Sequence, residues 1–144
     1  MNRIIGSCML FLLFLTSSCG TQQFFHSIAD NKQIDSRLVG VWQGSETDQQ
    51  ILGMTKEWKM TRKQNGTFTL DFKITQNNQV YTTIEEGTWW VKDGLFYEFH
   101  KVSGLTDVYD YSILSNKQVK FIAKNLNMNE ANQEYKFIDT KVSD

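Results

Sequence analysis

Apolar and polar residues alternate along most of the chain, which is the pattern of β-strands with one dry face and one wet face. In the clearest run, residues 67–75, every even position is apolar and every odd position is polar. No segment beyond the first 18 residues shows the periodicity of a strong helix. Strands are predicted over 39–44, 54–63, 67–75, 80–92, 95–102, 107–114, 118–124 and 134–142. The chain is therefore predicted to be all-β, with about eight strands.

Short turn sequences join the predicted strands in sequential order. Asn65-Gly66 and Asp93-Gly94 are dipeptides typical of two-residue hairpins. Successive hairpins give an up-and-down meander, whose two exposed edges disappear when the sheet closes on itself. We therefore predict an antiparallel up-and-down barrel of about eight strands, with a β-sandwich as the alternative.

The first 18 residues have the features of an export signal. Arg3 supplies a positive charge, and residues 9–15 form an apolar run, which is too short for a membrane span of roughly 20 residues. The run ends in Leu15-Thr16-Ser17-Ser18-Cys19, which resembles the lipobox of bacterial lipoproteins, with threonine where leucine is more usual. The resemblance implies cleavage before Cys19 and attachment of a diacylglycerol to its sulfur. The alternative is an ordinary secretory signal in which Cys19 has no such role.

This interpretation divides the chain into three parts. Residues 1–18 are the lipoprotein signal peptide, residues 19–36 are the lipidated cysteine and a tether with a short helical turn over 27–34, and residues 37–144 are the barrel domain. Cys8 leaves with the signal, so one cysteine remains and no intramolecular disulfide can form. Lipidation implies membrane attachment through the N-terminal lipid, in the cell envelope, on the outer membrane facing the periplasm.

The opening strand of the predicted barrel carries Gly40-Val41-Trp42. This Gly-x-Trp pattern, on the first of about eight strands, resembles the one that begins lipocalins and related calycin barrels. The resemblance covers roughly residues 37–142 and implies that the Trp42 ring packs at the closed end of the barrel, under a basic side chain from near the C-terminus. Lys136 is the best match for that side chain, in place of the usual arginine. The chain therefore resembles a short, bacterial lipocalin-like lipoprotein.

The interior of an eight-stranded barrel holds either its own side chains or one small ligand. By alternation, Val80 and Ile84 face inward. The candidate ligand contacts at inward positions are Trp58, Phe68, Phe72, Trp89, Tyr97, Tyr109 and Phe121. So many large rings are also able to fill a barrel of this size, and their number favours a filled core over a pocket. Trp89 and Trp90 face opposite sides, and a bulge at the preceding Gly87 would decide which of them points out.

The charged and titratable residues exclude some functions. Nucleic-acid binding needs a basic surface. The net charge of −1 and the pI near 6.1 argue against such a surface in this protein. His100 is predicted to approach Asp107 or Asp110 across neighbouring strands, as a general base or pH-sensitive ligand contact, or else to lie at the rim with no such role. No nucleophile accompanies it, and no spacing supplies the three or four ligands of a metal site.

These observations favour a protein that binds rather than catalyses. No catalytic residues and no cofactor are predicted. We expect a monomeric, lipid-anchored envelope protein that holds a small hydrophobic ligand in its barrel. The alternative is an envelope interaction protein, such as an inhibitor or an accessory subunit, with a filled barrel.

Overall fold

The structure, a computed structural model, describes the backbone of residues 25–28 and all atoms of residues 31–126 and 135–144. The expected signal peptide and Cys19 lie outside these residues. None of the described residues belongs to a helix long and apolar enough to cross a membrane. The elements are β1 (Phe25–Ile28), β2 (Lys32–Asp35), the 3-10 helix η1 (Ser36–Leu38), β3 (Gly40–Thr47), β4 (Met54–Arg62), β5 (Thr67–Gln76), β6 (Gln79–Lys92), β7 (Leu95–His100), β8 (Leu105–Ser115), β9 (Gln118–Asn125) and β10 (Lys136–Ser143).

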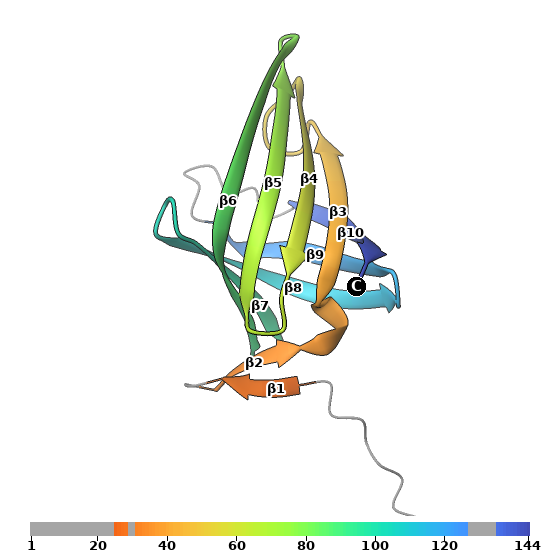
Figure 1. Cartoon of the computed structure of the whole chain (residues 1–144). Helices are drawn as coiled ribbons and strands as arrows, with labels where there is room; N and C mark the ends of the chain where they lie inside the picture. Colours follow the sequence, from red (N-terminus) through yellow and green to blue (C-terminus); the bar gives the residue numbers. More distant parts are fainter. Residues whose placement is uncertain (1–24, 29–30, 127–134) are drawn as a thin grey trace, which may run out of the picture.

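Eight of these strands, β3 to β10, form a closed antiparallel barrel (Figure 1). Each strand pairs with the next one in the sequence, and β10 pairs back onto β3. Because β3 and β10 pair with each other, they do not form exposed edges where they are paired. The predicted up-and-down barrel is confirmed, and the sandwich alternative is wrong.

The tight turns follow the predicted chemistry at one position and depart from it at another. Asp93 and Gly94 both adopt positive φ, 52° and 79°, as a two-residue hairpin turn requires. At Asn65-Gly66 only the glycine does, with φ 79°. The Gly66 N–H donates to the Lys63 carbonyl at 3.0 Å, so this connection is longer than the predicted two-residue turn.

Gly87 is required by close packing and not by a bulge. The pairing of β6 continues without a shift through Gly87, which lies opposite Phe68 on β5 and His100 on β7. A Cβ atom on Gly87 would lie 1.9 Å from the Phe99 carbonyl oxygen and 2.5 Å from the Phe68 ring. Only glycine therefore fits where these three strands meet.

The unbroken register decides which residues of β6 and β7 face the interior. Trp89 is inside and 1% exposed, while Trp90 lies outside and stacks on Tyr97 at 5.3 Å between ring centroids. The expectation that Tyr97 faces the interior is therefore wrong. Val80 and Ile84 are also outside, at 58% and 73% exposure, because they occupy even positions of β6, as Trp90 does, and therefore face the same side.

One end of the barrel is closed by the residues that precede it. The hairpin of β1 and β2 lies at that end, opposite the tip of the β5–β6 hairpin (Figure 1). Ile34 and Leu38 are fully buried in the barrel core. The last part of the expected tether therefore belongs to the folded domain. In the range 27–34, the described residues 27–28 and 32–34 are in strands β1 and β2, so the helical turn expected there is wrong for these residues. The first helical turn in the described part of the chain is η1.

The Gly-x-Trp pattern lies at this closed end. Trp42 is fully buried, and its indole N–H donates to the Leu38 carbonyl at 2.8 Å. Gly40 has φ 124°, and a Cβ atom there would lie 2.6 Å from the Lys141 side chain. The pattern therefore joins the first barrel strand to the segment that covers the end of the barrel.

Lys136 does not cover the Trp42 ring, so that expectation is wrong. Lys136 is the first residue of β10. The residue of β10 that pairs with Trp42 is Lys141, which lies near the other end of the strand. Two cations of the described residues lie over the Trp42 ring: Lys141, with Nζ at 5.6 Å, and Arg62, with Cζ at 5.9 Å from the ring centroid. A strand alternates its faces, so the inward side chains of β10 are those at odd positions, and Lys136 is exposed.

Candidate functional site

The half of the barrel away from η1 contains a cavity of about 670 Å³. Its wall is mostly apolar and includes Met54, Met60, Leu70, Phe72 and Ile74 from β4 and β5. Residues of the β3–β4 and β7–β8 loops form its rim, where Ile51 and Val102 are exposed. The large rings therefore do not fill the barrel, and the filled-core alternative does not describe this part of it.

The predicted ligand contacts divide into three groups. Trp58, Phe72 and Tyr109 line the cavity. A second group of inward residues packs in the core nearer the closed end and consists of Phe68, Trp89 and Phe121. Tyr97 lies on the outer face against Trp90. The structure thus brings three of the candidates together around the space that a guest would occupy.

A buried ion pair forms the floor of the cavity. The Arg62 guanidinium donates through Nη2 to Asp139 Oδ2 at 2.6 Å, and the two side chains are 2% and 0% exposed. Asp139 Oδ1 accepts from the Trp58 indole N–H at 2.8 Å. The Arg62 Cζ lies 5.1 Å from the ring centroids of both Phe96 and Phe121. The ion pair and the rings together seal the barrel beneath the cavity.

Sequence reasoning missed this ion pair, although the alternation contained a signal for it. Arg62 is in phase with Trp58 and Met60 on β4, so the pattern that places those residues inside also places Arg62 inside. Among the described residues, Arg62 Nε and Nη1 have no hydrogen-bond partner. Because aromatic faces surround the guanidinium, cation–π contacts take the place of those bonds.

Three carboxylates surround His100 on the cavity wall. Its Nδ1 lies 2.8 Å from Glu85 Oε2 on β6, and its Nε2 lies 3.3 Å from Glu98 Oε1 on β7 and 3.6 Å from Asp107 Oδ2 on β8. All four side chains line the cavity and are at most 21% exposed. Of the two partners predicted for His100, Asp107 is therefore present. Asp110 is instead paired with Lys124 at 2.9 Å on the outer face.

The carboxylates hold the imidazole in its charged form. Burial alone lowers the pKa of His100, but the hydrogen bonds and charges of Glu98, Glu85 and Asp107 outweigh it and raise the pKa to about 9. Burial raises the pKa of Tyr109, and the negative charges of Glu98 and Asp107 raise it further. His100 is thus an imidazolium at neutral pH, unsuited to act as a general base.

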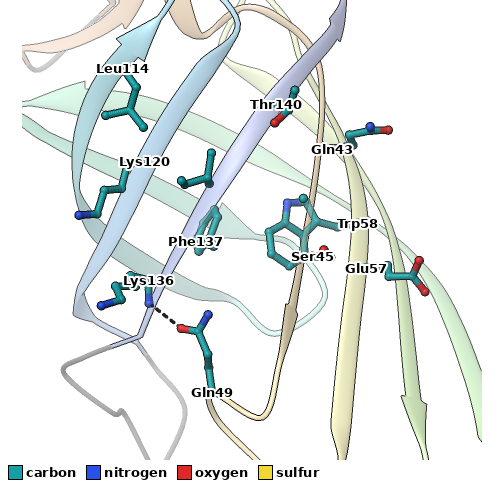
Figure 2. Close-up of a pocket in the computed structure, with 12 residues that line it drawn as sticks. Gln43, Ser45, Gln49, Glu57, Trp58, Leu114, Lys120, Lys136, Phe137 and Thr140 are labelled. Carbon is teal, nitrogen blue, oxygen red and sulfur yellow. Dashed lines mark hydrogen bonds between the residues drawn. The ribbon is translucent and has the colours of Figure 1, made fainter.

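A groove of about 1010 Å³ runs along the outside of the barrel at the seam between β3 and β10. Figure 2 shows Trp58 and Phe137 at its centre, where their rings meet edge to face at 5.1 Å. The same two residues line the inner cavity. Gly44 lies opposite Trp58, and a Cβ atom there would be 2.4 Å from the indole ring. The wall between groove and cavity is therefore a layer of two aromatic rings.

The seam itself has few backbone pairings. β10 and β3 are in register only at Thr140–Gln43, Lys141–Trp42 and Ser143–Val41, near the closed end. Nearer the mouth, the Lys136 N–H donates to Gln49 Oε1 at 3.2 Å (Figure 2). Side chains therefore close the part of the seam that lies beside the cavity.

The described residues include no group of three or more His, Cys, Asp and Glu side chains placed to hold a metal ion. Comparison of the sequence with known protein families and with curated proteins gives no match.

Proposed function

We propose that this chain is a lipid-anchored binding protein of the cell envelope that holds a small hydrophobic or amphipathic molecule inside its barrel. The observation that carries the proposal is the cavity of about 670 Å³, half-open and lined mainly by apolar side chains. Its volume lies within the range of roughly 300–1,000 Å³ that is usual for small-molecule sites. The closed eight-stranded barrel and the position of Trp42 at its closed end are consistent with the lipocalin resemblance.

The position of β1 supports the anchoring part of the proposal. Cys19 precedes Phe25, the first residue of β1, by six positions in the sequence. A chain of that length spans at most about 20 Å. Because β1 lies at the closed end of the barrel (Figure 1), a lipid on Cys19 would hold that end near the membrane and leave the mouth accessible to a guest.

Filling the cavity tests the binding function. Leu70→Trp places an indole in the middle of the cavity wall, and it is expected to weaken binding of the neutral fluorophore N-phenyl-1-naphthylamine at least about tenfold, since the ring takes the volume of the guest. The measurement is fluorescence titration of the full-length protein kept soluble in amphipol. Ile84→Trp, on the exposed face of the neighbouring strand, is the matched control and should bind like the wild type.

Thermal unfolding of both variants shows whether the barrel survives the substitutions. If Leu70→Trp unfolds, Ile74→Trp, nearer the mouth, replaces it. Saturable binding that is equal in the wild type, a folded cavity variant and the control would contradict the proposal, because the fluorophore would then bind elsewhere.

The anchor has its own test, which uses the two cysteines of the chain. Cells fed an alkyne fatty acid are expected to label the wild-type protein and the Cys8→Ser variant, but not Cys19→Ser, because only Cys19 follows the lipobox-like sequence. The label is read by coupling a dye to the alkyne after electrophoresis. Labelling that persists in Cys19→Ser would show that the resemblance to a lipobox is misleading.

A further inference from the structure

The first half of β6 has a neighbouring strand on one side only. β6 pairs with β5 along residues 79–88, but with β7 only along residues 87–92. Its one further pairing among the described strands is Val91 with Gln33 of β2. β6 therefore extends past β7 toward the tip of the β5–β6 hairpin, and its edge along residues 79–86 is open (Figure 1).

Backbone groups of alternate residues point out of this open edge. The Lys101 N–H donates to the Glu86 carbonyl at 3.0 Å, so the backbone groups of Glu86 point away from β5. In an antiparallel ladder, successive residues point alternately to the two sides of the strand, and β5 and β6 stay in register without a shift. The N–H and C=O groups of Val80, Thr82 and Ile84 therefore also point away from β5, where no described strand pairs with them.

The open edge lacks the features that usually protect a sheet edge. Natural edges are often protected by lysine, by proline or by a bulge. Residues 79–86 contain no lysine and no proline, and their pairing with β5 has no bulge. Val80, Thr82 and Ile84 also have exposed side chains, all on the outer face of the strand. The edge is therefore able to pair with another strand.

Two copies of this edge fit each other. When two β6 strands pair antiparallel with Thr82 opposite Thr82 of the second copy, each Val80 lies opposite an Ile84. All three pairs are then hydrogen-bonded pairs, in which both N–H···O bonds are exchanged. In any other antiparallel register, at least one of these three residues lies opposite a residue outside the three. The self-pairing centred on Thr82 therefore satisfies the whole open edge.

The inner-face side chains agree with the same register. Tyr81 lies opposite Thr83 of the second copy, and pairs of an aromatic and a β-branched residue stabilise neighbouring strands. Glu85 lies opposite Gln79 of the second copy. No two like charges therefore face each other across the two strands, although like charges in that position would oppose pairing.

We propose that this chain forms a dimer with two-fold symmetry, in which the open edges of two β6 strands pair antiparallel with Thr82 at the axis. The partner at the edge is thus a second copy of the chain, in place of the monomer expected from the sequence. The contact is the same patch on both copies, as two-fold symmetry requires. The dimer goes beyond the proposed binding function and does not depend on it.

The dimer joins the ends of the barrels that lie away from the expected anchor. β1 and β2 lie at the end of the barrel opposite the tip of the β5–β6 hairpin (Figure 1). The two-fold axis reverses the direction of β6, so the two closed ends point away from each other. The six positions from Cys19 to Phe25 span at most about 20 Å. A dimer that lies along a membrane surface can therefore keep both anchors in that membrane.

Charges introduced at position 82 test the axis. Because residue 82 lies opposite itself, Thr82→Glu and Thr82→Lys each bring like charges together and are expected to weaken self-association at least about tenfold. An equal mixture of the two variants places a glutamate opposite a lysine and is expected to associate as well as the wild type. Sedimentation velocity of the full-length protein in amphipol, with one copy carrying a fluorescent tag, measures the association.

Thr88 provides the matched control. It lies on the same strand and the same face, but it pairs with Phe99 of β7 inside the barrel sheet. Thr88→Glu and Thr88→Lys should therefore associate like the wild type. As a second test, Thr82→Pro removes an N–H that points to the open edge, a position at which strands tolerate proline. It should weaken association as the charged variants do, and thermal unfolding shows whether each variant keeps its fold.

The outcomes decide between this dimer and other forms of the protein. Association that is equal in the wild type and in the folded Thr82 variants would arise elsewhere in the chain and would contradict the proposal. A wild-type protein that sediments as a monomer at every concentration would contradict it as well. If both charged variants dissociate and their mixture does not associate, residue 82 does not lie opposite itself, and the proposed dimer is wrong.

Discussion

Replacing Asp139 by alanine is expected to lower the free energy of unfolding by about 3–5 kcal/mol, because it leaves the buried Arg62 charge without its partner. Asp139 is fully buried and accepts hydrogen bonds from Arg62 at 2.6 Å and from Trp58 at 2.8 Å. The substitution therefore removes the acceptor for two buried donors in one step. Urea unfolding of the full-length protein, followed by tryptophan fluorescence, measures the loss.

An exposed ion pair of the same length serves as the control. Lys73 and Glu57 are 2.6 Å apart on the outer face, and both side chains are nearly half exposed. Glu57→Ala is expected to cost less than about 1 kcal/mol, since solvent screens a surface pair. Equal losses in the two variants would mean that Asp139 and Arg62 are not buried as a pair. The double substitution Arg62→Met with Asp139→Leu should recover much of the loss, because no unpaired charge remains.

The strands and their closure could be predicted because alternation and turn chemistry are local. The predicted strand over 67–75 differs from β5 by one residue at its end. Asp93-Gly94 makes a two-residue turn because both residues adopt positive φ. Closure follows from the need to remove edges in a sequential meander. None of these steps needs contacts between distant residues.

The face on which Tyr97 lies could also have been predicted, by counting from the hairpin turn. A two-residue turn at Asp93-Gly94 pairs Lys92 with Leu95, and the same register pairs Trp89 with Glu98 and Trp90 with Tyr97. Partners opposite each other share a face. Trp89 and Tyr97 therefore cannot both face inward. The strand register determines the face on which Tyr97 lies, and its aromatic side chain does not.

Counting along the strands in the same way predicts that Glu85 and Glu98 face the interior, but it does not predict the cavity. Glu85 and Trp89 are in phase on β6, and Glu98 follows from the hairpin, so inward carboxylates are implied once Trp89 is inside. The volume that the side chains leave empty depends on how rings from distant strands pack, such as Phe96 against Phe121 at 5.0 Å. Alternation contains no information on that packing, so a filled and a hollow barrel could not be distinguished.

The stability of the barrel is expected to fall between about pH 6.5 and pH 9 because of His100. An unperturbed histidine has a pKa near 6.5 in an unfolded chain, whereas Glu98, Glu85 and Asp107 outweigh the effect of burial and raise the pKa to about 9 in the folded protein. The folded protein thus holds the proton more tightly than the unfolded chain does. Protonation stabilises the fold fully below about pH 6.5, and this contribution is lost as the pH rises through about 9.

The expected loss across this range is up to about 3 kcal/mol, since each unit of pKa difference corresponds to roughly 1.4 kcal/mol. Urea unfolding at a series of pH values measures it. His26→Gln removes the other histidine of the chain and should retain the decline, whereas His100→Gln should be nearly flat over the same range. A decline that persists in His100→Gln would assign it to another group.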